Sequence, residues 1–160
     1  MDQPIPYSGN PLDRLSPRRT DAAWVAERIE DPESRFLPLW RLQVLVKQGG
    51  DPQLGWARRG VCESMASDPG AILLGERGGV AHFAVDLSAL ADPLDALGLG
   101  VEARFSEPHA VVGGLPVGDA GIIAQARGLL TWHARHRFCG SCGEPTRSAD
   151  AGFWLSIAVR

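Results

Sequence analysis

A closely spaced cysteine pair that directly follows a long amphipathic segment is the feature that most constrains this fold. The stretch Phe138-Cys139-Gly140-Ser141-Cys142-Gly143 has C-x-x-C-G spacing. Two thiolates at this spacing can reach a single ion, because glycine permits the tight positive-φ bend around the metal. The pattern predicts a metal knuckle of the zinc-ribbon type, with Cys139 and Cys142 as ligands.

The predicted metal site is only half present. A tetrahedral zinc ribbon takes a second pair of ligands about 15 to 20 residues further on. That window ends in residues 152–160, which contain neither Cys nor His. An improvised His₂Cys₂ set with His133 and His136 is one alternative, and a packed or capping role for these two histidines is the other. The sequence leaves both open.

Cysteine usage bears on the environment of the chain. The chain has three cysteines, an odd number that disfavours a secreted disulfide scaffold. In a reducing cytosol the C-x-x-C pair is a metal knuckle or a redox couple. A thioredoxin-like couple sits at a helix N-terminus after a strand, whereas this pair follows a helix. The third cysteine, Cys62, is expected to be a small, semi-buried residue.

The helix before the knuckle is the strongest predicted element. It should run from Asp119 to about Arg137, with the acidic residue at its start and basic residues at its end, as the helix dipole favours. Apolar residues recur at helical spacing along this segment and predict one buried face. That stripe consists of Ile122, Ala126, Leu129, Leu130 and His133.

The earlier elements indicate a small sheet with flanking helices. Thr20 or Asp21 is suited to cap a short helix through Ile29. Alternation over 41–47 predicts a half-buried strand with Leu42, Val44 and Val46 on its inner face. The mixture indicates the α+β class, with a small antiparallel or mixed sheet. Further strands are expected over 71–74, 81–87 and 101–105, a hairpin loop over 76–79, and a short helix within 88–97.

Composition limits the possible partners. The net charge is −3, from 16 basic and 19 acidic residues, so the surface gives no reason to expect direct nucleic-acid binding or membrane binding. The first ten residues lack the features of a signal peptide, and no apolar run approaches the ~20 residues of a membrane span. We therefore expect a soluble, cytoplasmic protein.

Neither a catalytic nor a cofactor-binding residue can be assigned from these patterns. The loop Gly75-Glu76-Arg77-Gly78-Gly79 lacks the phosphate-loop pattern and joins two predicted strands, so a hairpin turn is expected there. There is no G-x-S-x-G, no H-E-x-x-H and no cluster of carboxylates. The sequence shows no active site.

Residues 124–143, AQARGLLTWHARHRFCGSCG, closely resemble the hallmark of the NADH pyrophosphatase branch of the Nudix hydrolases. In that branch a helix ending in A-x-x-L-x-x-W-H-x-x-H-x-F-C-x-x-C-G leads into a zinc ribbon. Weaker similarity lies in 8–14, 37–40 and 74–76, and the resemblance extends to about Phe153. The hallmark is matched at Ala126, Leu129 or Leu130, Trp132, His133, His136, Phe138, Cys139, Cys142 and Gly143.

The resemblance implies a parent enzyme that hydrolyses the pyrophosphate bond of NAD(H) with Mg²⁺ or Mn²⁺, with NAD-capped RNA ends as a second candidate substrate. The family's N-terminal domain is an accessory α+β unit with a degenerate Nudix-like fold, and its enzymes are homodimers. The implied organisation is an N-terminal domain over 1–118, a connecting helix over 119–137 and an incomplete zinc ribbon over 138–160.

The chain departs from the family pattern after Ala151-Gly152-Phe153. The family's second Cys pair is missing from 154–160, and the Nudix box G-x₅-E-x₇-R-E-x-x-E-E-x-G does not occur in the 160 residues. The box supplies the carboxylates that hold the catalytic ions. We therefore expect no activity from this chain alone, whether its reading frame is truncated or frameshifted or its boundary was engineered.

Two further hypotheses come from other functional classes. The chain could be a stand-alone dimerisation or interaction module, which uses its hairpin sheet and apolar tail. It could also be a small zinc-binding protein with His133, His136, Cys139 and Cys142 as its ligands.

Overall fold

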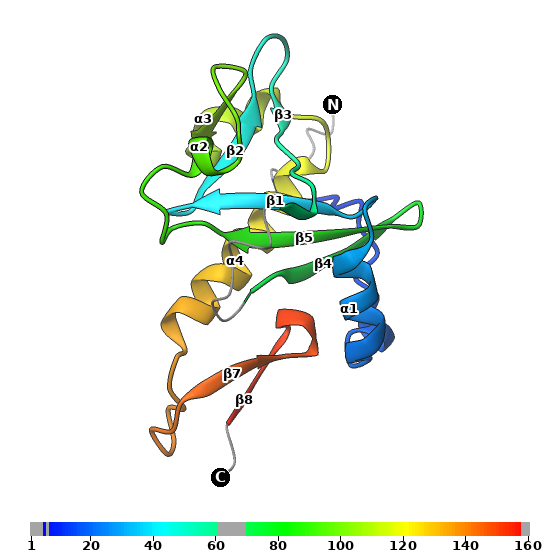
Figure 1. The fold of residues 1–160 in the computed structure, drawn as a ribbon, viewed down its shortest axis with the longest axis vertical. Coiled ribbons are helices and arrows are strands. Elements are labelled where there is room, and N and C mark those ends of the chain that lie inside the picture. Colours follow the sequence, from blue (N-terminus) through cyan, green and yellow to red (C-terminus); the bar gives the residue numbers. More distant parts are fainter. Residues whose placement is uncertain (1–4, 6, 61–69, 158–160) are drawn as a thin grey trace.

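The computed structural model describes residues 5, 7–60 and 70–157. They form a six-stranded sheet with helices on its sides, and a separate two-stranded hairpin that extends from one end (Figure 1). This mixed α and β architecture confirms the predicted fold class. Cys62, for which a semi-buried position was expected, lies outside the described residues.

The main sheet is mixed, and its centre is a parallel pair. Its order is β3-β2-β1-β5-β4, with β6 paired to β2. β1 runs parallel to β5, and Arg35 pairs with His82. The other pairings are antiparallel. The strands are β1 (Arg35–Trp40), β2 (Gln43–Lys47), β3 (Gln53–Leu54), β4 (Ile72–Arg77), β5 (Val80–Asp86) and β6 (Ala103–Ser106).

The expected half-buried strand over 41–47 was wrong in two respects. Arg41 and Leu42 form the turn between β1 and β2, with φ of 52° and 64°, so the strand begins at Gln43. Hairpin turns of this kind usually carry Asn or Gly, and their absence hid the turn. Leu45 is also as buried as its neighbours, and its side chain lies directly against Gly55, the residue after β3. Both faces are therefore buried in the middle of β2, and within the strand only Lys47 is exposed on the side that the alternation predicted to be polar.

Central strand β1 was not predicted at all. Its sequence RFLPLW does not alternate, and its four inner residues are buried. It also contains Pro38, a residue that central strands normally exclude because it has no N–H to donate. The edge of β1 that faces away from β5 has two separate partners. Phe36 forms an isolated bridge with Ala57, and pairing with β2 begins only at Leu39. Pro38 therefore lies in a gap in the ladder.

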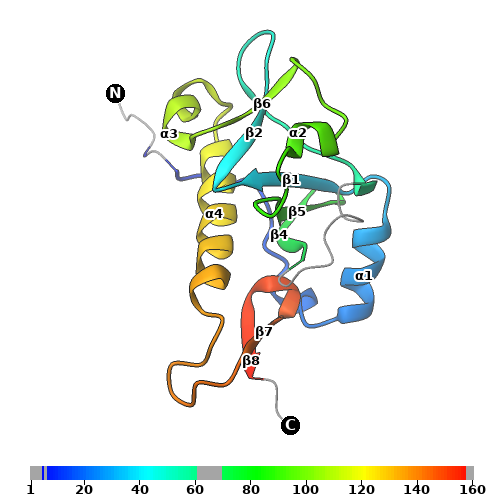
Figure 2. The same cartoon turned by 60° about the vertical axis from the view of Figure 1, so that its left-hand side comes forward.

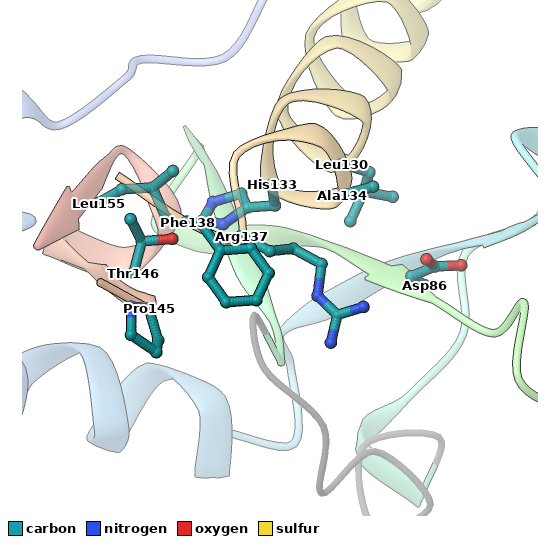
Figure 3. A pocket seen from close by; sticks show the side chains of 9 residues that line it. All are labelled: Asp86, Leu130, His133, Ala134, Arg137, Phe138, Pro145, Thr146 and Leu155. Carbon is teal, nitrogen blue, oxygen red and sulfur yellow. The ribbon is translucent and has the colours of Figure 1, made fainter. Parts of the chain in front are cut away.

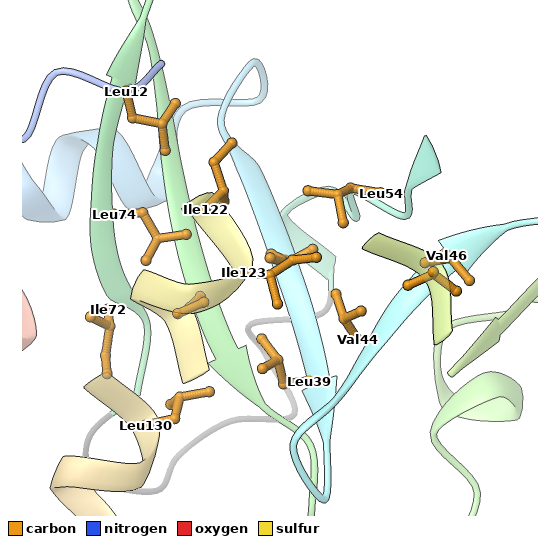
Figure 4. Close-up of a cluster of buried hydrophobic side chains, with 14 residues drawn as sticks. Leu12, Leu39, Val44, Val46, Leu54, Ile72, Leu74, Ile122, Ile123 and Leu130 are labelled. Carbon is orange, nitrogen blue, oxygen red and sulfur yellow. The ribbon is translucent and has the colours of Figure 1, made fainter. Parts of the chain in front are cut away.

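The long helix α4 (Asp119–Arg135) covers one face of the sheet, and its predicted apolar stripe is buried except at Leu129, which is partly buried. Ile122, Ile123, Ala126 and Leu130 are almost fully buried there (Figure 4). The helix therefore contributes to the main core. The division of the chain at 118 and 137 stays a prediction. The sheet residues of this core include Leu37, Leu39, Val44, Val46, Ile72, Leu74 and Ala84.

A second core lies on the opposite face, under α1 (Ala22–Glu30). Phe36 and Phe83 stack there with ring centroids 5.1 Å apart, and both are fully buried. The Asp21 carboxylate accepts a hydrogen bond from the backbone N–H of Trp24. This is the predicted cap, and it starts the helix one residue later.

The remaining elements connect the strands. The N-terminal arm runs along β4, where the backbones of Asp13 and Glu76 exchange two hydrogen bonds. The predicted hairpin between β4 and β5 is confirmed, with its turn at Gly78 and Gly79. The helix expected within 88–97 is only one turn long. The short helical elements outside α1 and α4 in this part of the chain are η1 (Ser16–Arg18), α2 (Pro93–Ala96), α3 (Pro108–Val111) and η3 (Val112–Gly114).

The hairpin consists of β7 (Thr146–Ala149) and β8 (Trp154–Ile157), joined by η4 (Asp150–Gly152). Figure 2 shows its looped end close to the sheet and its strands directed away from it. Only Gly152 is buried within these elements. None of the described helices is long and apolar enough to cross a membrane.

Candidate functional site: the cysteine knuckle

The knuckle links the end of α4 to β7. The backbone N–H of Gly143 donates to the carbonyl of Cys139 (2.8 Å), and Cys139 N–H donates to the carbonyl of Glu144 (2.8 Å). Gly143 has a φ of 74°, in the left-handed region that favours glycine. An isolated bridge between Phe138 and Pro145 closes the loop. The chain therefore makes the tight turn that the C-x-x-C-G spacing predicts.

The surroundings of the Cys139 thiol come from the knuckle itself. Hydrogen bonds from the backbone N–H groups of Cys142 and Ser141 lower the pKa of the Cys139 thiol, and the Cys142 side chain adds to this effect. Both thiols are free, and Cys142 is exposed. A lowered pKa makes the thiolate, the form that binds metals, easier to reach than at an ordinary cysteine.

The structure does not bring His133 and His136 into this cluster. His133 is 6% exposed, and its Nε2 donates to the carbonyl of Gly152 (2.8 Å). The Nδ1 of His136 lies 2.8 Å from the carbonyl of Trp132, one turn back along the helix. Across residues 5, 7–60 and 70–157, no three His, Cys, Asp or Glu side chains lie close enough to hold a metal ion. His133 thus has the packed role and His136 the capping role that the sequence left open.

A cleft of about 460 Å³ separates the knuckle and hairpin from the sheet. Figure 3 shows Arg137 and Phe138 on its α4 side and Thr146 and Leu155 on its hairpin side, with Asp86 on the sheet. Phe138 is 63% exposed. The lining thus combines an aromatic ring with charges of both signs, and it contains neither of the two thiols.

The glycine-rich loop between β4 and β5 is the hairpin turn that was expected, not a phosphate-binding loop that opens a helix. Gly78 and Gly79 form the turn of this hairpin, Glu76 and Arg77 are the last residues of β4, and neither glycine opens a helix. Sequence reasoning did miss Arg19, which is 4% exposed and binds backbone carbonyls of β4. A lone arginine in a Pro- and Arg-rich arm gives no signal of burial. Only the fold reveals it.

These features define the class: an α+β domain with a mixed sheet, to which a cysteine knuckle and a two-stranded hairpin are attached. The family described as NADH pyrophosphatase-like rudimentary NUDIX domain matches residues 33–132. The matched region runs from the residues before β1 into α4, more than half of the chain. The chain belongs to this family.

The chain is also similar to longer proteins. It is 26% identical to the NAD-capped RNA hydrolase NUDT12 of Macaca fascicularis, over 92% of this chain and 38% of that protein. It is 27% identical to the chloroplastic Nudix hydrolase 19 of Arabidopsis thaliana, over 91% of this chain and 41% of that protein. A 35-residue stretch is 46% identical to human NUDT12. The chain spans about two fifths of the relatives that it matches over most of its own length.

Proposed function

We propose that this chain is the accessory domain and the first half of the zinc ribbon of a Nudix NAD(H) diphosphatase. The family membership of residues 33–132 and the similarity to the NAD-capped RNA hydrolase NUDT12 support this proposal. The observation that carries it furthest is the knuckle at Cys139 and Cys142, which directly follows the family's helix. NAD-capped RNA is a second candidate substrate of the parent enzyme.

The donor set of the knuckle fits zinc. Two thiols with backbone N–H donors around them, in a turn closed by a glycine with positive φ, are the chemistry of half a structural zinc site. Cys139 and Cys142 would supply two of four ligands. When bound, the ion would hold the knuckle to the strands that carry the other ligands.

Hydrolysis would need groups that these 160 residues do not contain. The carboxylates of the Nudix box hold the Mg²⁺ or Mn²⁺ of the parent, and the box does not occur here. We therefore expect the chain alone to release no NMN from NADH in the presence of Mg²⁺ or Mn²⁺. Release above the level of a heat-denatured control would contradict this part of the proposal.

Zinc content tests the metal part. We expect one zinc ion per two chains. This ratio results if the half-ribbons of two chains pair across a homodimer and share the ion. Elemental analysis together with native mass measures it, and Cys139→Ser should remove the metal. Cys62→Ser is the matched control and should keep it. A folded natural chain without zinc would contradict a working half site.

A stand-alone interaction module is the second candidate function. Its support is the apolar surface of the knuckle and hairpin, where Phe138 and Trp154 are each 63% exposed and Ile157 is 41% exposed. Such a surface favours contact with another protein or a second copy. A monomer at all accessible concentrations would argue against the homodimer and against the dimerising form of this candidate.

The third candidate is a small zinc protein that uses His133 and His136. It predicts one zinc per chain, lost on His133→Ala or His136→Ala. The contact of His133 with Gly152 gives this candidate less support than the other two, because the ring would have to leave its buried position.

A further inference from the structure

Among the described residues, the β7–β8 hairpin meets the sheet domain at a small joint. The joint is the turn Ala151-Gly152-Phe153 between β7 and β8. Gly152 lies so close to Ile72 of β4 that an added Cβ would be 2.6 Å from the Ile72 side chain. His133 donates to the carbonyl of Gly152. Strands β7 and β8 extend beyond this joint.

Phe153 makes the joint's most specific contact. The guanidinium carbon of Arg19 lies 3.7 Å from the centroid of the Phe153 ring, a cation–π contact at close range. The two residues come from opposite ends of the chain. Arg19 belongs to the N-terminal arm just before α1, so this contact ties the arm to the hairpin.

The Arg19 side chain is held in one orientation by the backbone. Its Nε donates to the carbonyl of Arg14 (2.6 Å), Nη1 to that of Leu73 (2.6 Å) and Nη2 to that of Leu74 (3.1 Å). Leu73 and Leu74 lie at the β-bulge of β4, where the register with β5 shifts. Bulges disrupt the ladder locally and leave backbone groups for other partners. The planar fork of arginine fits such a set of acceptors.

The charge of Arg19 is retained in this site. Burial, with a smaller contribution from the Arg14 charge, lowers the pKa of Arg19 to about 10, so the group stays protonated at neutral pH. All three acceptors are neutral carbonyls. No carboxylate of the described residues pairs with Arg19, and a buried cation in such surroundings gains from an aromatic face. Phe153 supplies that face.

We propose that Arg19 is a positioning residue that, through Phe153, fixes the direction in which the β7–β8 hairpin and the Cys139–Cys142 knuckle leave the sheet. The proposal holds whether or not the knuckle binds zinc. Its failure is therefore distinct from failure of the proposed function.

The test is amide hydrogen exchange of the full chain, followed by mass spectrometry. Arg19→Met should accelerate exchange in 146–157 by at least tenfold and leave β1 and β5 unchanged. Arg14→Met is the matched control, because it alters an exposed arginine of the same arm and keeps the carbonyl that Arg19 binds. It should exchange like the natural chain. Uniform acceleration across the sheet, or none, would overturn the proposal.

Phe153→Leu decides the matter if Arg19→Met does not fold. This variant keeps an apolar side chain at 153 and every donor of Arg19. It should also accelerate amide exchange in 146–157 and leave exchange in the sheet unchanged. Phe153→Tyr restores an aromatic face and should return exchange to the natural rate. Where both single variants fold, the Arg19→Met, Phe153→Leu double variant should be made as well. Its exchange rate in 146–157 should exceed that of the faster single variant by less than twofold. Natural exchange in Phe153→Leu, or multiplying effects in the double variant, would overturn the proposal.

Discussion

The six-stranded sheet and the β7–β8 hairpin are stabilised in different ways. Phe36, Phe83, Leu37 and their neighbours in the sheet are fully buried, and α1 and α4 cover the two faces. In the hairpin, Trp154 and Ile157 are exposed, and Gly152 is the one buried residue. A two-stranded hairpin is at best marginally stable on its own. The sheet therefore depends on hydrophobic burial, whereas the hairpin depends on its joint and on whatever the cysteines of the preceding knuckle bind.

The largest effect should come from the sheet core. Phe83→Ala removes one of two stacked, fully buried rings, and should lower the free energy of unfolding by about 3–5 kcal/mol. Urea unfolding measures this change. Val117→Ala alters a residue that is 87% exposed and should change stability by less than about 0.5 kcal/mol. If the two variants were equally stable, burial would not be what holds the sheet.

An intermediate effect is expected at the joint. Gly152→Ala places a Cβ against Ile72 at a φ of 91°, and should cost the docked hairpin about 1–3 kcal/mol. Faster hydrogen exchange confined to 146–157 would show that the hairpin opens separately. Gly128→Ala is the control, because nothing lies within 4 Å of the new Cβ and alanine favours a helix. It should stabilise α4 by about 0.5–1 kcal/mol.

The smallest effect concerns pH and should arise in the sheet. Burial lowers the pKa of His82, Arg35 and Arg77 lower it further, and the Val80 carbonyl partly opposes them. The unfolded chain then binds the proton more readily, so stability falls as pH drops through the unfolded value of about 6.5 toward the folded pKa. In His82→Gln, the free energy of unfolding should fall less between pH 7 and pH 5 than it does in the natural chain.

His109→Gln is the matched control for that measurement, since His109 is exposed. It should leave the pH dependence of stability unchanged. An equal flattening in both variants would mean that the acid sensitivity does not originate at the sheet histidine.

The sequence carried enough information for the elements defined by local signals. Asp21 capped α1, the glycines at 78 and 79 marked the β4–β5 turn, and the stripe ending at His133 marked α4. The Cys139 and Cys142 pair was recognised from its spacing alone. Each of these features depends on residues close together in the chain.

What the sequence did not reveal depends on distant residues. β1 lacks a period because both of its faces are buried, and Pro38 is tolerated only because the ladder is interrupted beside it. Arg19 is buried because β4 bulges and Phe153 returns to cover it. No local pattern encodes such arrangements, since tertiary contacts decide them.

The parallel pairing of β1 with β5 has a consequence for the order in which the chain folds. Arg35 and His82 are neighbours in the sheet, so their pairing closes a loop of roughly 50 residues, whose entropy is lost before the contacts form. The local β4–β5 hairpin has no such loop to close. During synthesis β1 emerges first but must wait for β5. Until then the edge of β1 that pairs with β5 is open, although β2 already pairs with the other edge, and the nascent chain is most exposed to aggregation in that interval.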